Sequence, residues 1–342
     1  MMDKFVMIIF GASGDLTKRK LMPALYSLYR DKRLKGGFSV IGVGRTVYSD
    51  ADYRAYIYTE LEQFVKPDEQ DKELMDGFTQ HLYYLPIDPA IEAGYVRLRE
   101  RLQEITDEKE PDNLLFYLAT PPSLYGVIPL HLKKAHLNRG RARIIVEKPF
   151  GYDLYSAEEL NRIYASVFEE HQIYRIDHFL GKETAQNLLA FRFANGIFEP
   201  LWNRNYIDYI EVTAVENLGI EQRGGFYDTA GALRDMVQNH LIQLVALTAM
   251  EPPAVFNADT FRNEVVKVYE SLTPLTEEDF EEHIVRGQYT ASGSKKGYRE
   301  EKNVSPESRT ETYIAMKLGI SNWRWSGVPF YIRTGKQMPT KV

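Results

Sequence analysis

Residues 5–17 read Phe-Val-Met-Ile-Ile-Phe-Gly-Ala-Ser-Gly-Asp-Leu-Thr, and this stretch decides how the first half of the chain folds. Its continuous apolar run is typical of a parallel strand that is buried on both faces. The two glycines that follow, and the helical pattern that continues to about Tyr29, predict a strand, a tight turn and a helix. The spacing is G-x-x-G, with Thr17 where a dinucleotide-binding fingerprint has its third glycine. The turn therefore predicts a variant dinucleotide site, and a tight turn without a ligand is the alternative.

Strands alternate with helices through the first half of the chain. Further buried strands are expected over residues 38–43, 114–119 and 144–146, and helices over 52–64 and 91–105. This alternation predicts a doubly wound parallel sheet, which is a Rossmann-like fold. Ligands of such sheets bind beyond the carboxyl ends of the strands.

The residues after the second strand indicate which dinucleotide binds. The strand ends in Gly44-Arg45-Thr46, where an NAD site usually carries an acidic residue for the ribose hydroxyls. A guanidinium at this point suits a 2′-phosphate instead. We therefore expect NADP, with NAD as a second choice because an arginine also stacks on plain adenosine. A surface arginine after a strand is the alternative.

The pattern changes after about Ile176. Alternating runs over residues 206–216 and 310–320 predict an antiparallel sheet with one covered face, and helices are expected over 232–250 and 261–272. The second half therefore reads as an α+β domain.

Two domains are expected from this change of pattern. Residues 1–177 form an NADP-binding Rossmann-like domain, and residues 178–342 form an α+β domain with a large, mainly antiparallel sheet. A last strand is expected over 328–333, close to Val342. We expect the sheet of the second domain to be incomplete at this point.

The composition excludes several classes of protein. The net charge of −6 gives no general basic field for nucleic acid or anionic membranes, so any phosphate site must be built locally. The absence of cysteine removes disulfides, thiolate nucleophiles and cysteine metal sites, and it fits a reducing compartment. No apolar run approaches the length of a membrane span, and the N-terminus lacks the features of a signal peptide. We expect a cytoplasmic protein.

Residues 175–183, Arg-Ile-Asp-His-Phe-Leu-Gly-Lys-Glu, are the densest group of functional side chains. Lys182 precedes a helix expected over 183–194, where the helix dipole already places partial positive charge. A lysine is favourable there if an anion binds, because backbone N–H groups and a cation together form a phosphate site. A solvated loop with ordinary charges is the alternative.

Each of the other candidate site residues could instead have a purely structural role. His240 lies on the apolar stripe of its expected helix, where a histidine is more often a core residue than a base. Asp235 precedes it by five residues, about 140° around an α-helix, so the two need not face the same way. Lys148 stands between a strand and a proline, and Glu216 ends a strand, so each suits either a ligand or a strand end.

Five motifs occur in one order along the chain: residues 11–20 (Gly-Ala-Ser-Gly-Asp-Leu-Thr-Lys-Arg-Lys), 147–151 (Glu-Lys-Pro-Phe-Gly), 175–183, 223–228 (Arg-Gly-Gly-Phe-Tyr-Asp) and 234–240 (Arg-Asp-Met-Val-Gln-Asn-His). Together they resemble the glucose-6-phosphate dehydrogenase family. The resemblance spans essentially the whole chain, and its most specific motif is 175–183.

The resemblance implies oxidation of glucose 6-phosphate at C1 to the lactone, with hydride transfer to NADP, as the first step of the oxidative pentose phosphate pathway. It implies His240 as the general base and Asp177 as the residue that orients it. The substrate-binding residues that it implies are His178, Lys182, Lys148, Glu216, Asp235, Lys336 and Lys341. The cofactor-binding residues that it implies are Gly11, Ser13, Gly14, Asp15, Arg45, Thr46, Thr120, Pro121 and Lys148.

No metal is expected, because transfer of the hydroxyl proton to a base neutralises the developing negative charge. The resemblance implies that residues 178–342 are the substrate and dimerisation domain. Family members continue past Val342 with further strands of the large sheet, which typically forms the dimer interface. The resemblance therefore implies a homodimer or tetramer for full-length members. A non-catalytic dinucleotide- or sugar-phosphate-binding homologue, or a truncated inactive product, is the alternative. A related sugar oxidoreductase is disfavoured, since a neutral sugar would leave the expected phosphate ligands without a partner.

Overall fold

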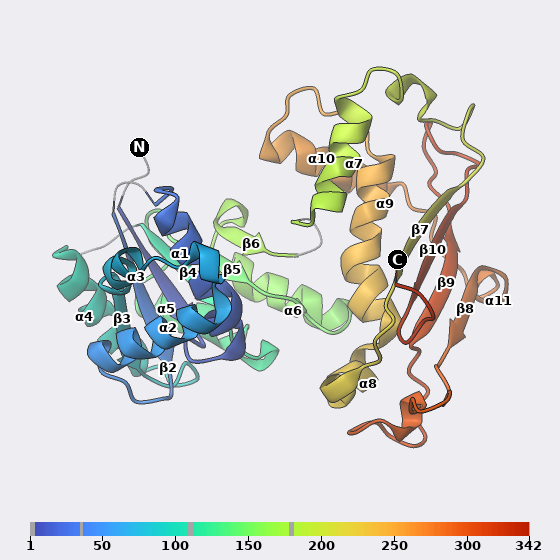
Figure 1. Ribbon diagram of the computed structural model, residues 1–342. Helices are drawn as coiled ribbons and strands as arrows, with labels where there is room; N and C mark the ends of the chain where they lie inside the picture. Colours follow the sequence, from blue (N-terminus) through green and yellow to red (C-terminus); the bar gives the residue numbers. More distant parts are fainter. Residues whose placement is uncertain (1–3, 35–36, 109–112, 178–180, 342) are drawn as a thin grey trace. The chain divides into compact units, whose positions relative to one another are not determined.

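The computed structural model describes residues 4–34, 37–108, 113–177 and 181–341. The chain divides into two compact units, Met1–Ile176 and Asp177–Val342. Each unit has its own sheet and its own buried apolar residues (Figure 1).

Unit 1 is built on a six-stranded sheet in which every pair of neighbouring strands is parallel. The strand order is β3-β2-β1-β4-β5-β6, which is the order of a doubly wound sheet, so the predicted fold class is confirmed. The strands are β1 (Phe5–Phe10), β2 (Phe38–Gly44), β3 (Leu82–Pro86), β4 (Leu114–Leu118), β5 (Arg143–Val146) and β6 (Ile173–Arg175). The order reverses between β1 and β4, so the crevice for a ligand lies at the carboxyl ends of these two strands.

Both faces of this sheet are covered. The helical segments of unit 1 are η1 (Thr17–Leu21), α1 (Met22–Arg30), α2 (Asp50–Phe64), η2 (Pro67–Glu69), α3 (Lys72–Thr79), α4 (Gly94–Thr106), η3 (Pro122–Leu124), α5 (Val127–Lys134), α6 (Leu154–Ala165) and η4 (Glu170–Gln172). Ile8 and Phe10 of β1 belong to one hydrophobic cluster, whereas Met7 and Ile9 belong to another. Because successive side chains of a strand point to opposite faces, the apolar run of β1 supplies both cores.

Unit 2 is built on a four-stranded sheet in the order β7-β10-β9-β8. The strands are β7 (Ile210–Val215), β8 (Ile284–Gly287), β9 (Tyr313–Leu318) and β10 (Phe330–Gly335). Only the β10–β7 pair is parallel among these described pairings, so the prediction of a mainly antiparallel sheet is confirmed. Both β7 and β9 are shorter than the alternating runs over 206–216 and 310–320 suggested. For β7 the reason is that the chain turns at residues 203–207 before the strand begins.

The helical segments of unit 2 are α7 (Glu183–Phe193), η5 (Glu199–Leu201), η6 (Glu221–Arg223), α8 (Gly224–Ala232), η7 (Leu233–Leu241), α9 (Ile242–Ala249), α10 (Ala258–Glu270), α11 (Asp279–His283) and η8 (Tyr298–Glu300). Figure 1 shows α7, α9 and α10 on one side of the sheet. Leu241 and Val245 share a buried cluster with Phe330 and Ile332 of β10. The helix predicted over 232–250 is therefore present, as η7 continued by α9, and its apolar stripe faces the sheet.

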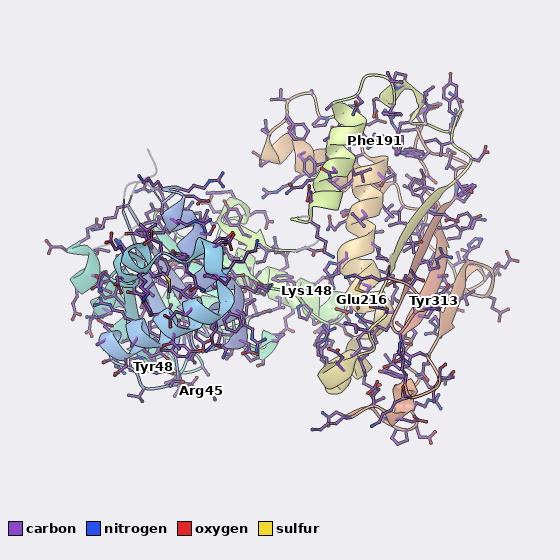
Figure 2. The ribbon with its side chains drawn as sticks, in the orientation of Figure 1. Arg45, Tyr48, Lys148, Phe191, Glu216 and Tyr313 are labelled. Carbon is purple, nitrogen blue, oxygen red and sulfur yellow. The ribbon has the colours of Figure 1, made fainter. Side chains whose placement is uncertain are left out.

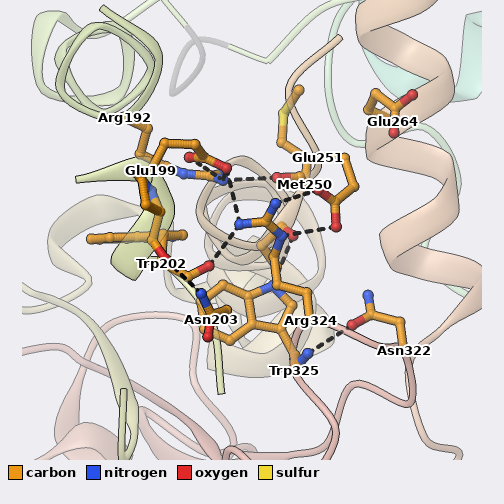
Figure 3. Close-up of polar contacts among 12 residues, drawn as sticks. Arg192, Glu199, Trp202, Asn203, Met250, Glu251, Glu264, Asn322, Arg324 and Trp325 are labelled. Atoms are coloured by element: carbon orange, nitrogen blue, oxygen red, sulfur yellow. Dashed lines mark hydrogen bonds and ion pairs between the residues drawn. The ribbon is translucent and has the colours of Figure 1, made fainter. Parts of the chain in front are cut away.

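Three side chains from other segments satisfy the last carbonyl groups of α9 (Figure 3). Arg192 of α7 is fully buried and donates from Nη1 to the Leu247 carbonyl and from Nη2 to the Met250 carbonyl, each at 2.9 Å. Trp202 Nε1 donates to the Thr248 carbonyl and Trp325 Nε1 to the Ala249 carbonyl, each at 2.8 Å. A helix leaves its last four carbonyls without partners of its own, so these donors close its end.

Two carboxylates balance the arginines of this cap. Glu199 lies 3.1 Å from Arg192 Nη2 and 2.9 Å from Arg324 Nη1. Arg324 also pairs with Glu251 and donates to the Trp202 carbonyl at 2.7 Å. Buried charges are tolerated when they are paired and hydrogen-bonded in this way. The cluster thus fixes α7, α9 and the segment before β10 to one another.

We predict that Arg192→Met lowers the free energy of unfolding of the chain by about 3 kcal/mol or more, because two buried carbonyls lose their donor and Glu199 loses one of its two cations. The matched control is Arg262→Met on α10, where the arginine is exposed and its distance to Asp259 is 3.9 Å. The control should change stability by less than about 0.5 kcal/mol. Denaturant unfolding followed by tryptophan fluorescence measures both, and equal losses in the two variants would contradict this account of the cap.

Candidate active site

A glycine turn closes the carboxyl end of β1. The amides of Gly11 and Ala12 donate to the Val43 carbonyl at 2.9 and 3.1 Å, and the Gly14 amide donates to the Gly11 carbonyl at 3.0 Å. Gly11 has φ +87°, and a Cβ there would overlap the Ala119 carbonyl oxygen. Only glycine fits this conformation and this close approach. The turn consequently brings backbone from β1, β2 and β4 together at the switch point of the sheet.

Thr17 braces this turn in place of the third glycine. Its side chain is fully buried, and its hydroxyl donates to the Gly11 carbonyl at 3.0 Å. The departure from the G-x-G-x-x-G pattern therefore has a structural reason, since the hydroxyl holds the start of the helix against the turn. Asp15 is exposed at the same turn, 3.6 Å from Lys18 Nζ.

Polar side chains surround the turn, with capacity for further hydrogen bonds. The buried hydroxyl of Thr120, just beyond β4, has no hydrogen-bond partner among the described residues. Ser13 Oγ accepts from the Thr46 hydroxyl at 3.3 Å. Burial, then the neighbouring Tyr48, raises the pKa of Tyr84 to about 12. A cradle that excludes any Cβ, with an unpaired hydroxyl beside it, fits a dinucleotide.

The loop after β2 carries the residues predicted to choose between NADP and NAD. Arg45 and Thr46 are exposed there, and Figure 2 shows Arg45 and Tyr48 at the same end of unit 1. The Tyr48 ring stacks on Tyr56, with ring centroids 5.5 Å apart. The arginine is thus accessible next to a fixed aromatic surface.

Lys148 follows β5, as Thr120 and Pro121 follow β4. It is half-buried, and the neighbouring Glu147 accepts a hydrogen bond from the Tyr117 hydroxyl at 2.6 Å. Because parallel strands end at the same edge of a sheet, the predicted cofactor residues of unit 1 all lie at its carboxyl edge.

Unit 2 contains a histidine–carboxylate pair. His240 is buried in η7, and its Nδ1 lies 2.7 and 2.8 Å from the two carboxylate oxygens of Asp177. A carboxylate on Nδ1 fixes the orientation of the ring and leaves Nε2 as the nitrogen that accepts a proton. The two residues that were predicted to act together are therefore in hydrogen-bond contact, 63 positions apart in the sequence.

The helix around His240 is a π-helix over Leu233–Leu241. In this form each amide bonds to the carbonyl five residues before it, so residues five apart are separated by roughly 50° around the axis. Asp235 and His240, both buried, are therefore on the same side of the helix. The 140° separation expected for an α-helix was wrong for this segment.

Glu216 and Lys336 form an ion pair at the ends of β7 and β10. Lys336 is buried, and its Nζ lies 5.7 Å from the centre of the Tyr227 ring. Figure 2 marks Glu216 in this unit. Two residues predicted to contact the substrate are thus brought together with an aromatic ring.

Of the remaining predicted substrate-binding residues, the structure describes two and leaves one out. Lys182 is exposed at the N-cap of α7, next to the start of the helix. Lys341 is exposed after β10. His178 lies outside the described residues.

Sequence reasoning singled out neither Tyr227 nor Tyr269. Burial, then the charges of Asp235 and Glu311, raises the pKa of Tyr227, and its hydroxyl has no hydrogen-bond partner within the described part of the chain. Burial, then the charge of Asp177, raises the pKa of Tyr269 on α10. Tyr227 falls inside the 223–228 motif, which is a signal that could have found it, whereas Tyr269 has no sequence signal.

The described residues contain neither a group of metal ligands nor a helix that could span a membrane. Among them, no three histidine, aspartate or glutamate side chains are grouped closely enough to hold a metal ion. In the same ranges, no helix combines the length and the apolar character that crossing a membrane requires.

Family profiles match both halves of the chain. The profile described as glucose-6-phosphate dehydrogenase, NAD binding domain, matches residues 8–187. The profile described as glucose-6-phosphate dehydrogenase, C-terminal domain, matches residues 189–342.

Relatives match over nearly the whole chain. Glucose-6-phosphate 1-dehydrogenase of Aggregatibacter actinomycetemcomitans is 55% identical over 98% of this chain and 69% of the relative. The enzyme of the same name from Bacillus subtilis is 47% identical over 99% of this chain and 69% of the relative. A solved glucose-6-phosphate dehydrogenase in complex with its substrate glucose-6-phosphate superposes with a TM-score of 0.89 at 38% identity, over 98% of this chain and 69% of that one. The structure from Mycobacterium avium gives 0.85 at 40% identity, over 98% and 71% of the two chains.

We predict that Gly11→Ala weakens dinucleotide binding and destabilises unit 1 by about 2 kcal/mol or more, because the added Cβ meets backbone at a positive φ. Gly196→Ala is the matched control, since nothing lies within 4 Å of the added atom there. Thermal unfolding measures the effect on stability, and isothermal titration calorimetry with the dinucleotide measures the effect on binding. A Gly11→Ala variant with the stability and affinity of the parent would contradict the described turn.

Proposed function

This chain belongs to the glucose-6-phosphate dehydrogenase family, a family of oxidoreductases, and we propose that it oxidises D-glucose 6-phosphate at C1 to 6-phospho-D-glucono-1,5-lactone with NADP⁺ as hydride acceptor. This reaction is the first step of the oxidative pentose phosphate pathway. The observation that carries the proposal is the contact of His240 Nδ1 with the Asp177 carboxylate at 2.7 Å. It is the pairing that a general base needs when it removes a hydroxyl proton.

His240 is the general base in this proposal. Its Nε2 accepts the proton of the C1 hydroxyl while the C1 hydrogen leaves as hydride, and the oxygen left behind becomes the lactone carbonyl. Asp177 holds the imidazole through Nδ1 and stabilises the imidazolium that forms, as a carboxylate does in a catalytic triad. Imidazole suits this task because its ordinary pKa lies near neutral pH.

The substrate phosphate is assigned to His178 and Lys182. The N-cap position of Lys182 supports this assignment, because the first amides of α7 and the lysine together favour an anion. Lys336, Glu216, Asp235, Lys341 and Lys148 are assigned to the remaining contacts with the sugar and its phosphate. Such contacts fix the position of C1, and positioning is usually a large part of the lowering of a barrier.

Unit 1 is assigned to the dinucleotide. Gly11, Ser13, Gly14 and Asp15 form the turn for its diphosphate, and Thr120 and Pro121 lie at the strand end assigned to the nicotinamide. Bound NADP⁺ supplies the hydride acceptor. Arg45 and Thr46 bind the 2′-phosphate, which is supported by the exposed guanidinium and by the aromatic Tyr48 nearby.

We further propose that the protein acts in the cytoplasm as a homo-oligomer. The absence of cysteine is compatible with a reducing compartment. On the sheet of unit 2, Tyr209 and Tyr331 form an exposed aromatic pair, 57% and 41% accessible, which suits a surface that a second copy covers. The chain spans about two thirds of the length of its relatives, 69% in both cases given above.

We predict that the chain reduces NADP⁺ in the presence of glucose 6-phosphate and that His240→Asn lowers kcat by about 10²- to 10⁴-fold, the contribution of a general base. The increase in absorbance of the reduced nicotinamide measures the reaction. His171→Asn is the matched control, since His171 is exposed on η4 and should leave kcat unchanged. Activity that survives His240→Asn would reject the mechanism. Glucose 6-phosphate that binds without any reduction of NADP⁺ would instead favour a non-catalytic binding protein.

We predict that Arg45→Ala raises KM for NADP⁺ by about 10- to 100-fold, the effect of losing charge-assisted hydrogen bonds to a phosphate, and leaves KM for NAD⁺ nearly unchanged. Arg99→Ala on the exposed face of α4 serves as the control. Steady-state kinetics with each dinucleotide measures the difference. An equal effect on both dinucleotides would show that the arginine contacts adenosine and not the 2′-phosphate.

A further inference from the structure

The helix that carries His240 begins without a capping side chain of its own. Its N-cap residue, Ala232, has no side chain that accepts a hydrogen bond. A residue far along the chain takes this role. The Ala232 amide donates to the Glu311 carbonyl, and the Leu233 amide donates to the Glu311 carboxylate at Oε1, each at 3.0 Å. Glu311 thus satisfies two amides at the start of η7 with its backbone and its side chain.

The backbone at this point is shaped around the carboxylate. Gly231 interrupts the helical geometry between α8 and η7, with φ 69° and ψ 175°. A Cβ at Gly231 would lie 2.5 Å from Glu311 Oε1. Glycine therefore provides both the positive φ and the space in which the carboxylate reaches the Leu233 amide.

Glu311 is itself held by the sheet. The next residue, Thr312, is fully buried, and its amide donates to the Gly287 carbonyl at 2.8 Å. The Thr312 carbonyl accepts from the Lys336 amide, and its hydroxyl accepts from the Tyr289 amide, each at 2.9 Å. The start of η7 is consequently tied through two adjacent residues to the strand end that carries Lys336.

The negative charge of Glu311 is favourable at the start of η7. The N-terminus of a helix carries partial positive charge, so a carboxylate there is stabilising. The side chain is only half-buried, and it comes from a segment outside the helix that it caps. Asp235 follows Leu233 by two residues, and His240 lies five residues further along the π-helix.

We propose that Glu311 is a positioning residue for the oxidation, because its carboxylate fixes the register in which η7 presents Asp235 and His240. This inference rests on the proposed function, in which His240 is the base. Glu311 does not itself contact the sugar or the dinucleotide in this account. Its removal should therefore affect the chemical step more than the binding of glucose 6-phosphate.

The variants are Glu311→Ala, which removes the acceptor, and Glu311→Gln, which keeps an oxygen that accepts from the Leu233 amide and removes only the charge. Glu307→Ala is the control, an exposed carboxylate of the same segment. We expect Glu311→Ala to lower kcat by about 10- to 100-fold through misplacement of the base, with KM for glucose 6-phosphate changed by less than about threefold. Glu311→Gln should restore kcat to within about threefold of the parent, and the control should match the parent.

Two readouts do not depend on turnover. Hydrogen–deuterium exchange over residues 232–236 should be about fivefold faster in Glu311→Ala, as expected for the loss of a helix cap, and close to the parent in Glu311→Gln. The low-field proton resonance of the His240 Nδ1–H, which reports its hydrogen bond to Asp177, should shift or broaden in Glu311→Ala only.

The results distinguish a failure of the positioning role of Glu311 from a failure of the proposed oxidation of glucose 6-phosphate. An unchanged kcat in Glu311→Ala, or an unchanged His240 resonance despite faster exchange, would overturn the positioning role and leave only a structural cap. If Glu311→Ala does not fold, Glu311→Gln is the test of the proposal. If kcat of Glu311→Gln falls as far as that of His240→Asn, the hydrogen bond from the Leu233 amide is not what positions the base. A parent that does not reduce NADP⁺ would reject the proposed function alone, and exchange and the His240 resonance would then test the cap.

Discussion

The helix formed by η7 and α9 is held at both ends by side chains that it does not contain. Glu311 accepts from its first amides, and three donors, Arg192, Trp202 and Trp325, satisfy its last carbonyls. Since a helix cannot satisfy these groups by itself, unit 2 has a defined helix only where the surrounding segments are in place. The apolar stripe against β10 sets the rotation of the helix, and the two caps set its position along the axis. Together they determine where His240 stands.

Unit 1 depends on a constraint of a different kind. The Gly11 turn is defined by exclusion of side-chain atoms, since the Ala119 carbonyl occupies the space that any Cβ would take. The hydroxyl of Thr17 then closes the turn from the helix side. The arrangement leaves backbone amides and the Thr120 hydroxyl at the edge of the sheet. These groups can donate hydrogen bonds to a negatively charged ligand without a cluster of lysines. An acidic protein can in this way bind a phosphate-rich cofactor.

The local hydrophobic pattern predicted helices and strands well where burial of apolar side chains decides the structure. The run of β1 read correctly as a strand buried on both faces, and the alternation around β7 and β9 read correctly as sheet, although residues 206–209 keep the pattern without joining the strand. The contact of His240 with Asp177 came from the family resemblance, because spacing cannot bring together residues 63 positions apart. The residues that cap this helix could not be predicted for the same reason, since Glu311 lies 78 residues from Leu233. The angle between Asp235 and His240 was wrong because no residue pattern distinguishes a π-helical turn from an α-helical one.

The π-helical form of η7 restricts how the sequence of this segment can vary. Removing one residue between Leu233 and Leu241 while the segment stays π-helical would turn everything after it by roughly 80° around the helix axis. The apolar stripe of α9 would then leave β10, and the carbonyls at the end of α9 would leave Arg192. Substitutions at exposed positions such as Gln238 change nothing in this alignment. Homologous chains can therefore differ in the residues of the segment, whereas its length is set by the two fixed ends.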